Sequence, residues 1–215
     1  MKASRNLLMV AMAGAVVILA GSPAMAGLGS VIWSDGFETG LGNWTFFNPS
    51  GDATALAQVT GTYTSYSQGA IVPCEGQYMA RVYKDNDGLA YLISNPIPAI
   101  PGQQFEIEVC VGGLGEYDNC GFRWNKWGYS PDGGATLTWV GDNFRNVNPL
   151  QCGIDYEFNA SGNAVNVLLG LDRTCRDGLG HSAFFDHVVV TTPEPATLAL
   201  LGMGVAGLAA RRRRK

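Results

Sequence analysis

No stretch of ten or more residues between Gly27 and Thr192 has the apolar spacing of an amphipathic helix. Short alternating or apolar runs occur instead, separated by Gly, Asn, Asp and Pro, and 24 of the chain's 29 glycines lie in this region. The clearest run is Gln104–Val111, where every second residue from Phe105 is apolar. Runs of this kind predict strands with one face toward a core, and the Gly-rich breaks predict turns between them.

About ten strands of this kind are expected in all. The others lie at 30–33, 44–47, 77–83, 89–94, 121–129, 135–140, 155–158, 163–169 and 182–191. Their number and spacing predict an all-β domain over residues 27–192, an antiparallel β-sandwich that is jelly-roll-like. The length suits one domain and is too short for two ordinary ones.

The N-terminal segment differs from this domain. Lys2 and Arg5 precede an apolar run over residues 7–20, and Ala24-Met25-Ala26 supplies the small residues that a signal peptidase accepts. We therefore expect a signal peptide with a signal helix over residues 1–26, cut after Ala26. A retained anchor is the alternative, but a run of about 14 residues spans only ~21 Å of a ~30 Å hydrocarbon core.

The C-terminal segment, residues 193–215, has three parts in a fixed order. Pro193-Glu194-Pro195 is followed by the apolar run Ala196–Ala210, and the chain ends in Arg211, Arg212, Arg213, Arg214 and Lys215. The apolar run predicts a transmembrane helix, and the basic stop over residues 211–215 predicts that its end stays cytoplasmic. About 15 residues cover only ~22 Å, which suits a segment that is later cut better than a lasting anchor. A plain single-span anchor is the alternative.

This tripartite tail closely resembles the PEP-CTERM sorting signal of Gram-negative bacteria. Such tails are read by exosortases, membrane enzymes that resemble sortases, in species that make exopolysaccharide. The resemblance implies a sorting motif formed by Pro193, Glu194 and Pro195 together with the Arg211–Arg214 run. It also implies an inner-membrane intermediate, cleavage near the motif, and release or attachment at the cell surface. It implies nothing about residues 27–192.

The charge of the chain is concentrated in its parts. The formal net charge is -4, but residues 27–195 hold 7 bases and all 18 acids, so this region carries about -11. An acidic domain argues against a nucleic-acid partner. A calcium ion could still bridge it to an acidic polysaccharide.

The two ends of the predicted domain resemble the first and last strands of galactose-binding-like and carbohydrate-binding jelly rolls. The resemblance rests on Asp35-Gly36-Phe37-Glu38, on Leu41-Gly42-Asn43-Trp44 and on the closing run Phe184–Val190. In those domains an opening carboxylate and a closing Asp often meet around a structural Ca²⁺. Carried over, the ligands are Glu38 and Asp186, with backbone carbonyls completing the shell. The alternative is that both residues cap strand ends.

Ser130–Thr136 resembles the Asp-box turn and predicts a hairpin between two strands rich in aromatic residues. Ring faces can stack on sugars, so the candidate carbohydrate-binding residues are Trp124, Trp127, Tyr129 and Trp139. Ordinary core packing is the alternative, because strand alternation places Trp124 on one face and Trp127 with Tyr129 on the other. Some of these rings must therefore lie in the core.

The chain has five cysteines, all in the exported region. They are Cys74, Cys110, Cys120, Cys152 and Cys175. An oxidising envelope favours two disulfides and one leftover thiol, and the sequence leaves the pairing open. We prefer a Cys110–Cys120 bridge, on loop length alone.

A catalytic site is the weakest interpretation. Glu106 and Glu108 project from one face of a strand about 7 Å apart, a separation compatible with a glycosidase acid/base pair. Alternating polar residues are, however, typical of any solvated sheet face. We expect a non-enzymatic exported protein of the cell surface or extracellular matrix, associated with exopolysaccharide. The alternatives are a lectin-like module and a secreted glycan-active hydrolase or lyase.

Overall fold

The computed structural model describes residues 30–65, 69–115, 123–141, 150–173 and 180–193. In these ranges the regular structure consists of strands β1 to β14. None of the residues in these ranges forms a helix with the length and hydropathy of a membrane span. The predicted signal helix, the predicted helix over 196–210 and the basic stop all lie outside the ranges described. Contacts between residues group Ser30–Thr192 as one compact unit.

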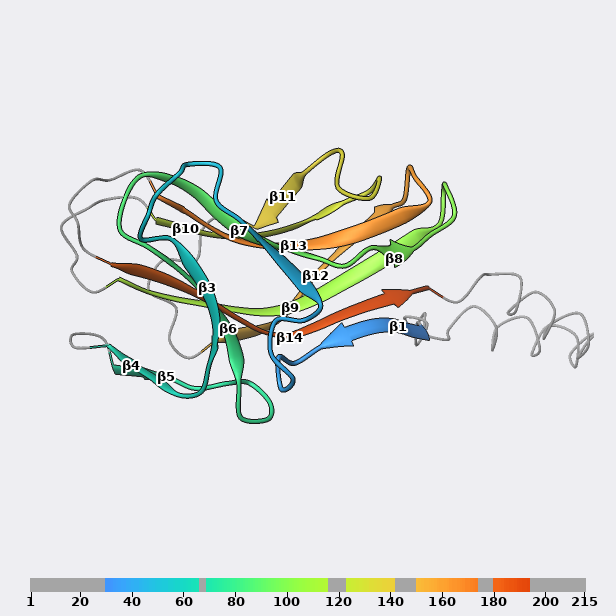
Figure 1. Ribbon diagram of the computed structural model, residues 1–215. Helices are drawn as coiled ribbons and strands as arrows, with labels where there is room; N and C mark the ends of the chain where they lie inside the picture. The colour runs from blue at the N-terminus through green and yellow to red at the C-terminus, as the bar shows by residue number, and fades with distance from the viewer. Residues whose placement is uncertain (1–29, 66–68, 116–122, 142–149, 174–179, 194–215) are drawn as a thin grey trace, which may run out of the picture. The chain divides into compact units, whose positions relative to one another are not determined.

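The strands form two antiparallel six-stranded sheets (Figure 1). Sheet A has the order β12 (Gln151–Asn159), β9 (Gln104–Gly115), β14 (His181–Thr192), β6 (Met79–Lys84) and β3 (Leu56–Thr60), and β1 (Ser30–Asp35) also pairs with β14. Sheet B has the order β11 (Thr138–Gly141), β10 (Arg123–Ser130), β13 (Ala164–Arg173), β7 (Gly88–Ser94) and β2 (Trp44–Phe47), and β8 (Ile97–Pro98) also pairs with β13. The all-β, jelly-roll-like antiparallel sandwich is therefore confirmed.

The core lies between the two sheets. Strand β9 follows the predicted alternation, because Phe105, Ile107 and Val109 are buried while Gln104 is exposed. Facing them from sheet B are Val165, Val167, Leu169 and Leu171 of β13. Burial of these β-branched and aliphatic side chains supplies the main driving force for folding.

A second, smaller apolar cluster lies on the outer face of sheet A. It contains Ile71, Met79, Cys110, Leu150 and Phe184, with Tyr63 packed against them. Ile71 and Tyr63 belong to the hairpin of β4 (Tyr63–Ser65) and β5 (Gly69–Ile71), which lies below sheet A in Figure 1. This hairpin therefore covers part of the outer face of sheet A.

Candidate functional site

A row of residues crosses the outer face of sheet B. In the strand register Phe47 of β2 lies opposite Tyr91 of β7, Tyr91 lies opposite Gly170 of β13, and Gly170 lies opposite Lys126 of β10. The flanking residues of the same strands, such as Leu92 and Leu169, point into the core. Because side chains alternate along a strand, the row faces away from the core.

The first two members of the row stack on each other. The ring centroids of Phe47 and Tyr91 are 5.3 Å apart and their planes are within 11° of parallel. Rings that stack between neighbouring strands stand on the sheet rather than lie on it. Phe47 is 43% exposed, which is high for a phenylalanine in a strand. Burial raises the pKa of the Tyr91 hydroxyl, so Tyr91 remains a neutral hydrogen-bonding group.

Trp139 of β11 reaches across the row from the other side. It lies opposite Gly128, and a Cβ added at Gly170 would meet Trp139 Cη2 at 3.0 Å. Its indole is 5.8 Å from the Tyr91 ring at 83°, so it lies across the sheet rather than upright on it. Gly170 therefore leaves room for this indole, which is partly exposed, while Gly128 leaves room for the backbone of β11.

A polar pair lies beside the indole. Lys126 Nζ and Asp172 Oδ2 are 2.7 Å apart, and their side chains are 19% and 25% exposed. Asp172 is two residues from Gly170 on β13 and thus shares its outward face. The pair places a cation and an anion next to an aromatic surface, the combination that fixes the hydroxyls of a sugar stacked on a ring. We call Phe47, Tyr91, Trp139, Lys126 and Asp172 the aromatic row.

The structure separates the four predicted carbohydrate-binding residues. Trp139 lies in the aromatic row, but Trp127 is 1% exposed and packs in the core, so the expectation for Trp127 is corrected. Tyr129 is half-buried against the core, with its ring stacked 3.9 Å from that of Phe158. Trp124 belongs to β10, but its side chain is not among those described.

Sequence reasoning missed Phe47 and Tyr91. Their strands also carry the buried apolar residues Trp44 and Leu92. Because apolar residues occur on both faces of these strands, the sequence pattern does not show which residues face outward. Their adjacency depends on the pairing of β2 with β7, which the sequence alone does not specify.

The turn between β10 and β11 has the predicted hairpin form. Asp132 Oδ1 accepts hydrogen bonds from Ser130 Oγ at 2.9 Å and from Thr136 N at 2.8 Å. The bonds from Thr136 lower the pKa of Asp132. Gly133 and Gly134 have φ of 77° and 103°, which other residues adopt only with strain. The turn thus positions β11, and with it Trp139.

The two predicted calcium ligands hold opposite ends of one loop. Glu38 Oε1 accepts hydrogen bonds from Gln77 N and Tyr78 N at 2.8 and 2.9 Å. Asp186, which is fully buried, accepts from Cys74 N at 2.7 Å and from Glu75 N at 3.1 Å. Both carboxylates therefore act as anchors of the loop 74–78.

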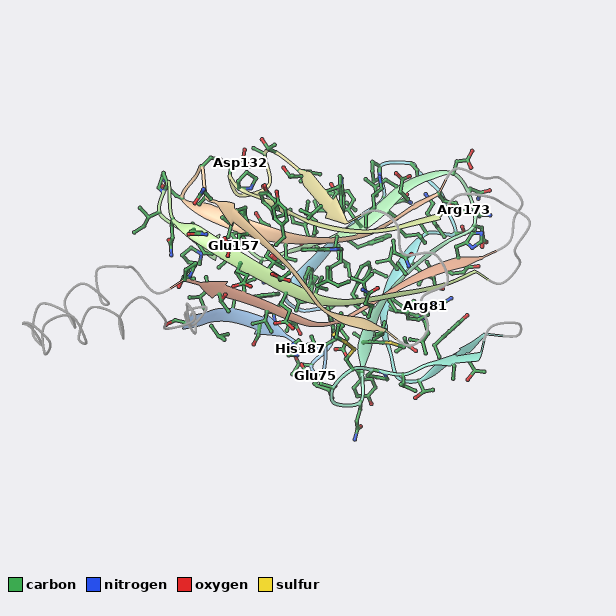
Figure 2. All side chains as sticks on the ribbon, turned by 180° about the vertical axis from the view of Figure 1, so that it is seen from behind. Glu75, Arg81, Asp132, Glu157, Arg173 and His187 are labelled. Atoms are coloured by element: carbon green, nitrogen blue, oxygen red, sulfur yellow. A yellow bond between two sulfur atoms is a disulfide. The ribbon has the colours of Figure 1, made fainter. Side chains whose placement is uncertain are left out.

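Burial and a neighbouring carboxylate both disfavour the charged form of Asp186. Burial raises the pKa of Asp186 despite its backbone hydrogen bonds, and the Glu75 carboxylate raises it further. A bound cation would offset both effects, and carboxylate oxygens are the ligands that Ca²⁺ prefers. His187 Nδ1 lies 2.9 Å from Glu75 Oε2 (Figure 2). Among the described residues, the one group of three or more side chains placed to hold a metal ion is the cysteine cluster, so calcium at Glu38 and Asp186 stays a prediction.

Three of the five cysteines come together on sheet A. The sulfur atoms of Cys74, Cys110 and Cys152 all lie within 4.8 Å of one another. Cys110 is at disulfide distance from Cys152. The preferred Cys110–Cys120 bridge stays a prediction, whereas the pairing of β12 with β9 places Cys152 beside Cys110. Cys120 and Cys175 fall in segments that the structure leaves undescribed.

The two candidate catalytic glutamates lie on the outer face of sheet A. Glu106 is opposite Glu157 and Glu108 is opposite Asp155 in the pairing of β9 with β12. Gln104 Nε2 donates to Glu157 Oε2 at 2.7 Å. These four carboxylates therefore lie on the other sheet from the aromatic row.

The C-terminal residues 191–214 match the PEP-CTERM protein-sorting motif. The chain carries a PEP-CTERM tail. This match supports the expectation that the protein is exported in Gram-negative bacteria and sorted by an exosortase. No curated protein matches the chain.

Solved structures match the sandwich. The CBM22-1 xylan-binding domain of Xyn10C from Paenibacillus barcinonensis aligns with a TM-score of 0.51 and 14% identity, over 80% of this chain and 99% of that domain. A Stig cyclase, Fisc, from Fischerella sp. TAU aligns with a TM-score of 0.52 and 16% identity, over 81% and 93% of the two chains. At these identities the similarity shows the fold alone. That fold is shared by carbohydrate-binding modules and by cyclases, so function must be argued from the site.

Proposed function

We propose that this protein is an exported, non-catalytic β-sandwich that binds a polysaccharide chain along the aromatic row on the outer face of sheet B. The observation that carries the proposal is Trp139, whose partly exposed indole reaches over Gly170 on the outer face of sheet B. Apolar ring faces of this kind stack on the C–H faces of sugar rings. The sorting motif at residues 191–214 supports delivery to the envelope, where polysaccharide is available.

The aromatic row extends over neighbouring strands, which suits an extended polymer better than a single sugar. Phe47 lies at the edge strand β2, and Trp139 lies at the opposite edge strand β11. The ring centroids are 5.8 Å apart from Trp139 to Tyr91 and 5.3 Å apart from Tyr91 to Phe47, so the three rings together face about two sugar units. Lys126 and Asp172 provide a donor and acceptors for hydroxyls between the two ends.

The electrostatics favour a neutral chain. Residues 27–195 carry about -11, which repels a polyanion over the whole domain. The single cation in the row, Lys126, is already paired with Asp172. We therefore propose a neutral exopolysaccharide as the ligand, with calcium at Glu38 and Asp186 as a structural ion outside the binding face.

The remaining steps follow from the two ends of the chain. Signal peptidase removes residues 1–26, the tail holds the chain at the inner membrane, and exosortase processing then frees or attaches it at the surface. The carboxylates Glu106 and Glu108 lie on the other sheet, away from the proposed ligand, and have no catalytic role in this proposal.

Affinity electrophoresis tests the binding site. The chain is run through gels that contain neutral polysaccharides such as xylan, galactan, glucan or mannan, and its retardation is compared with that of Trp139→Ala. We expect retardation by at least one polymer and a loss of affinity of about tenfold or more in the variant, because about 1.4 kcal/mol of stacking corresponds to a factor of ten. Tyr78→Ala is the matched control, since Tyr78 is 41% exposed and lies outside the row. Equal retardation of Trp139→Ala and wild type would refute the proposed site.

A further inference from the structure

The cysteine cluster on sheet A contains one sulfur with two partners. Both Cys74 and Cys110 are at disulfide distance from Cys152. Cys152 lies in a bulge of β12, where the register with β9 shifts between Gln151 and Ile154. Gly153, at φ 71°, adopts the left-handed conformation that the bulge requires. The bulge thus turns Cys152 toward both neighbours.

A sulfur atom can form only one disulfide, so the two pairings of Cys152 exclude each other. The Cα atoms of Cys110 and Cys152, on the paired strands β9 and β12, are 4.0 Å apart, just below the usual disulfide range of about 4.4–6.8 Å. Those of Cys74 and Cys152 are 7.4 Å apart, a separation that requires the backbone to move before a bridge closes. Cys110–Cys152 is therefore the pairing that the backbone favours, and Cys74 is the third thiol.

We propose that Cys74, Cys110 and Cys152 form a thiol–disulfide exchange site in which Cys152 pairs alternately with Cys110 and Cys74. Three cysteine sulfurs within 4.8 Å of one another carry this proposal. An attacking thiolate must reach the disulfide sulfur directly, and this cluster meets that requirement within a single chain. Cys74 and Cys152 are exposed, so external thiols and small disulfides can reach the site.

The exchange is balanced within the chain. The Cys74 thiolate attacks the Cys152 sulfur, the Cys74–Cys152 bond forms, and the Cys110–Cys152 bond breaks. Cys110 leaves as a thiolate and takes up the proton that Cys74 released, so no net oxidation occurs. The one disulfide of the cluster forms first by exchange with an external disulfide, which is reduced to two thiols.

Burial makes the two leftover thiols unequal. Cys110 is 1% exposed within an apolar cluster that includes Phe184 and Met79, whereas Cys74 is exposed. The backbone N–H of Cys74 donates to Asp186 Oδ2 at 2.7 Å, which fixes the start of the loop 74–78. Exchange therefore alternates a shielded and an accessible thiol.

Peptide mapping of the full chain, purified from the envelope of its host, tests the pairing. The protein is denatured in acid with a fast alkylating reagent and digested with pepsin, so that exchange stops during handling. We expect Cys152 linked to Cys110 in a major population and to Cys74 in a minor one. Cys110→Ser should move all of Cys152 to Cys74, and Cys74→Ser should move all of it to Cys110. Pairing of Cys152 with Cys120 or Cys175 would overturn the proposal.

Alkylation of the native wild type separates exchange from a fixed mixture. The reagent reaches Cys74 and not Cys110, so exchange should drain the Cys74–Cys152 population to none as alkylated Cys74 accumulates. A Cys74–Cys152 fraction that persists after complete alkylation would overturn exchange. Three reduced thiols that retain Zn²⁺ in a native mass spectrum, and lose it to a chelator, would overturn it in favour of a thiolate metal site. These readouts do not depend on polysaccharide binding.

Discussion

The carboxylate of Asp52 links two turns that position one end of the aromatic row. Asp52 follows β2, which carries Phe47, and its Oδ1 accepts from Thr54 N at 2.9 Å, from Thr54 Oγ1 at 2.7 Å and from Asn86 Nδ2 at 3.0 Å. Its Oδ2 accepts from Asn86 N at 2.9 Å. Asn86 lies in the turn from β6 to β7, which carries Tyr91. We predict that Asp52→Ala destabilises the fold.

The number of lost bonds sets the magnitude. Asp52→Ala removes four hydrogen bonds at a net value of about 1 kcal/mol each, so the free energy of unfolding should fall by about 3–4 kcal/mol. Asp52→Asn keeps an oxygen at the Oδ1 position and three of the bonds. Its side-chain NH2 group then faces the backbone N–H of Asn86, and these two donors cannot bond to each other, which costs about 1–2 kcal/mol. At about 2–4 °C per kcal/mol, the alanine variant should melt about 10 °C below wild type and the asparagine variant about 4 °C below.

The pH dependence gives an independent check. Burial of Asp52 raises its pKa, but the hydrogen bonds from Asn86 and Thr54 outweigh burial and hold the pKa well below the ordinary 3.8. A depressed carboxyl pKa stabilises the fold fully above the unfolded value, and this contribution is lost as the pH falls toward the folded value. The melting difference between wild type and Asp52→Asn should therefore shrink below about pH 4. Circular dichroism melts measure both effects, and equal losses in the alanine and asparagine variants would refute the reasoning.

Three further predictions concern the core, the floor of the site and the calcium ligand. Trp127→Ala should cost about 3–5 kcal/mol in urea unfolding because it opens a core cavity, whereas Trp139→Ala should cost less than about 2 kcal/mol; equal costs would contradict the separation of the two rings. Gly170→Ala should weaken polysaccharide binding in titration calorimetry and cost about 1–3 kcal/mol of stability, because its Cβ would meet Trp139 Cη2 at 3.0 Å, Tyr91 Cβ at 3.1 Å and the Ala90 carbonyl oxygen at 3.3 Å; unchanged affinity would count against the indole as the ligand surface. Chelation should lower the melting temperature of wild type but not of Asp186→Asn, and a wild type that melts equally with and without chelator would exclude a structural calcium ion.

Local sequence patterns predicted the type of fold and much of its core. Alternation in Gln104–Val111 identified Phe105, Ile107 and Val109 as inward-facing, because period-two patterning survives any choice of neighbouring strand. Gly133 and Gly134 identified the hairpin after β10 for a similarly local reason, since their positive φ is a property of the turn itself. Features set within one element could therefore be read from the chain.

Features set by pairing between distant elements could not be predicted from the sequence. Alternation separates Trp127 from its neighbours on β10, but only the packing of the two sheets decides that Trp127 faces inward. Phe47 and Tyr91 meet because β2 pairs with β7, and both belong to runs that are apolar on either face. The cysteine pairing depends on a bulge in β12, where one extra residue changes the neighbour of Cys110.

Hydroxyl-radical footprinting of the full chain, with and without a bound polysaccharide, tests the location of the binding face directly. Bound polymer should protect Trp139, Phe47 and Tyr91 on sheet B and leave the exposed rings of Tyr78 and Tyr156 as reactive as before. Protection of Tyr78 or Tyr156 with no change at Trp139 would place the ligand elsewhere on the sandwich and contradict the proposed function.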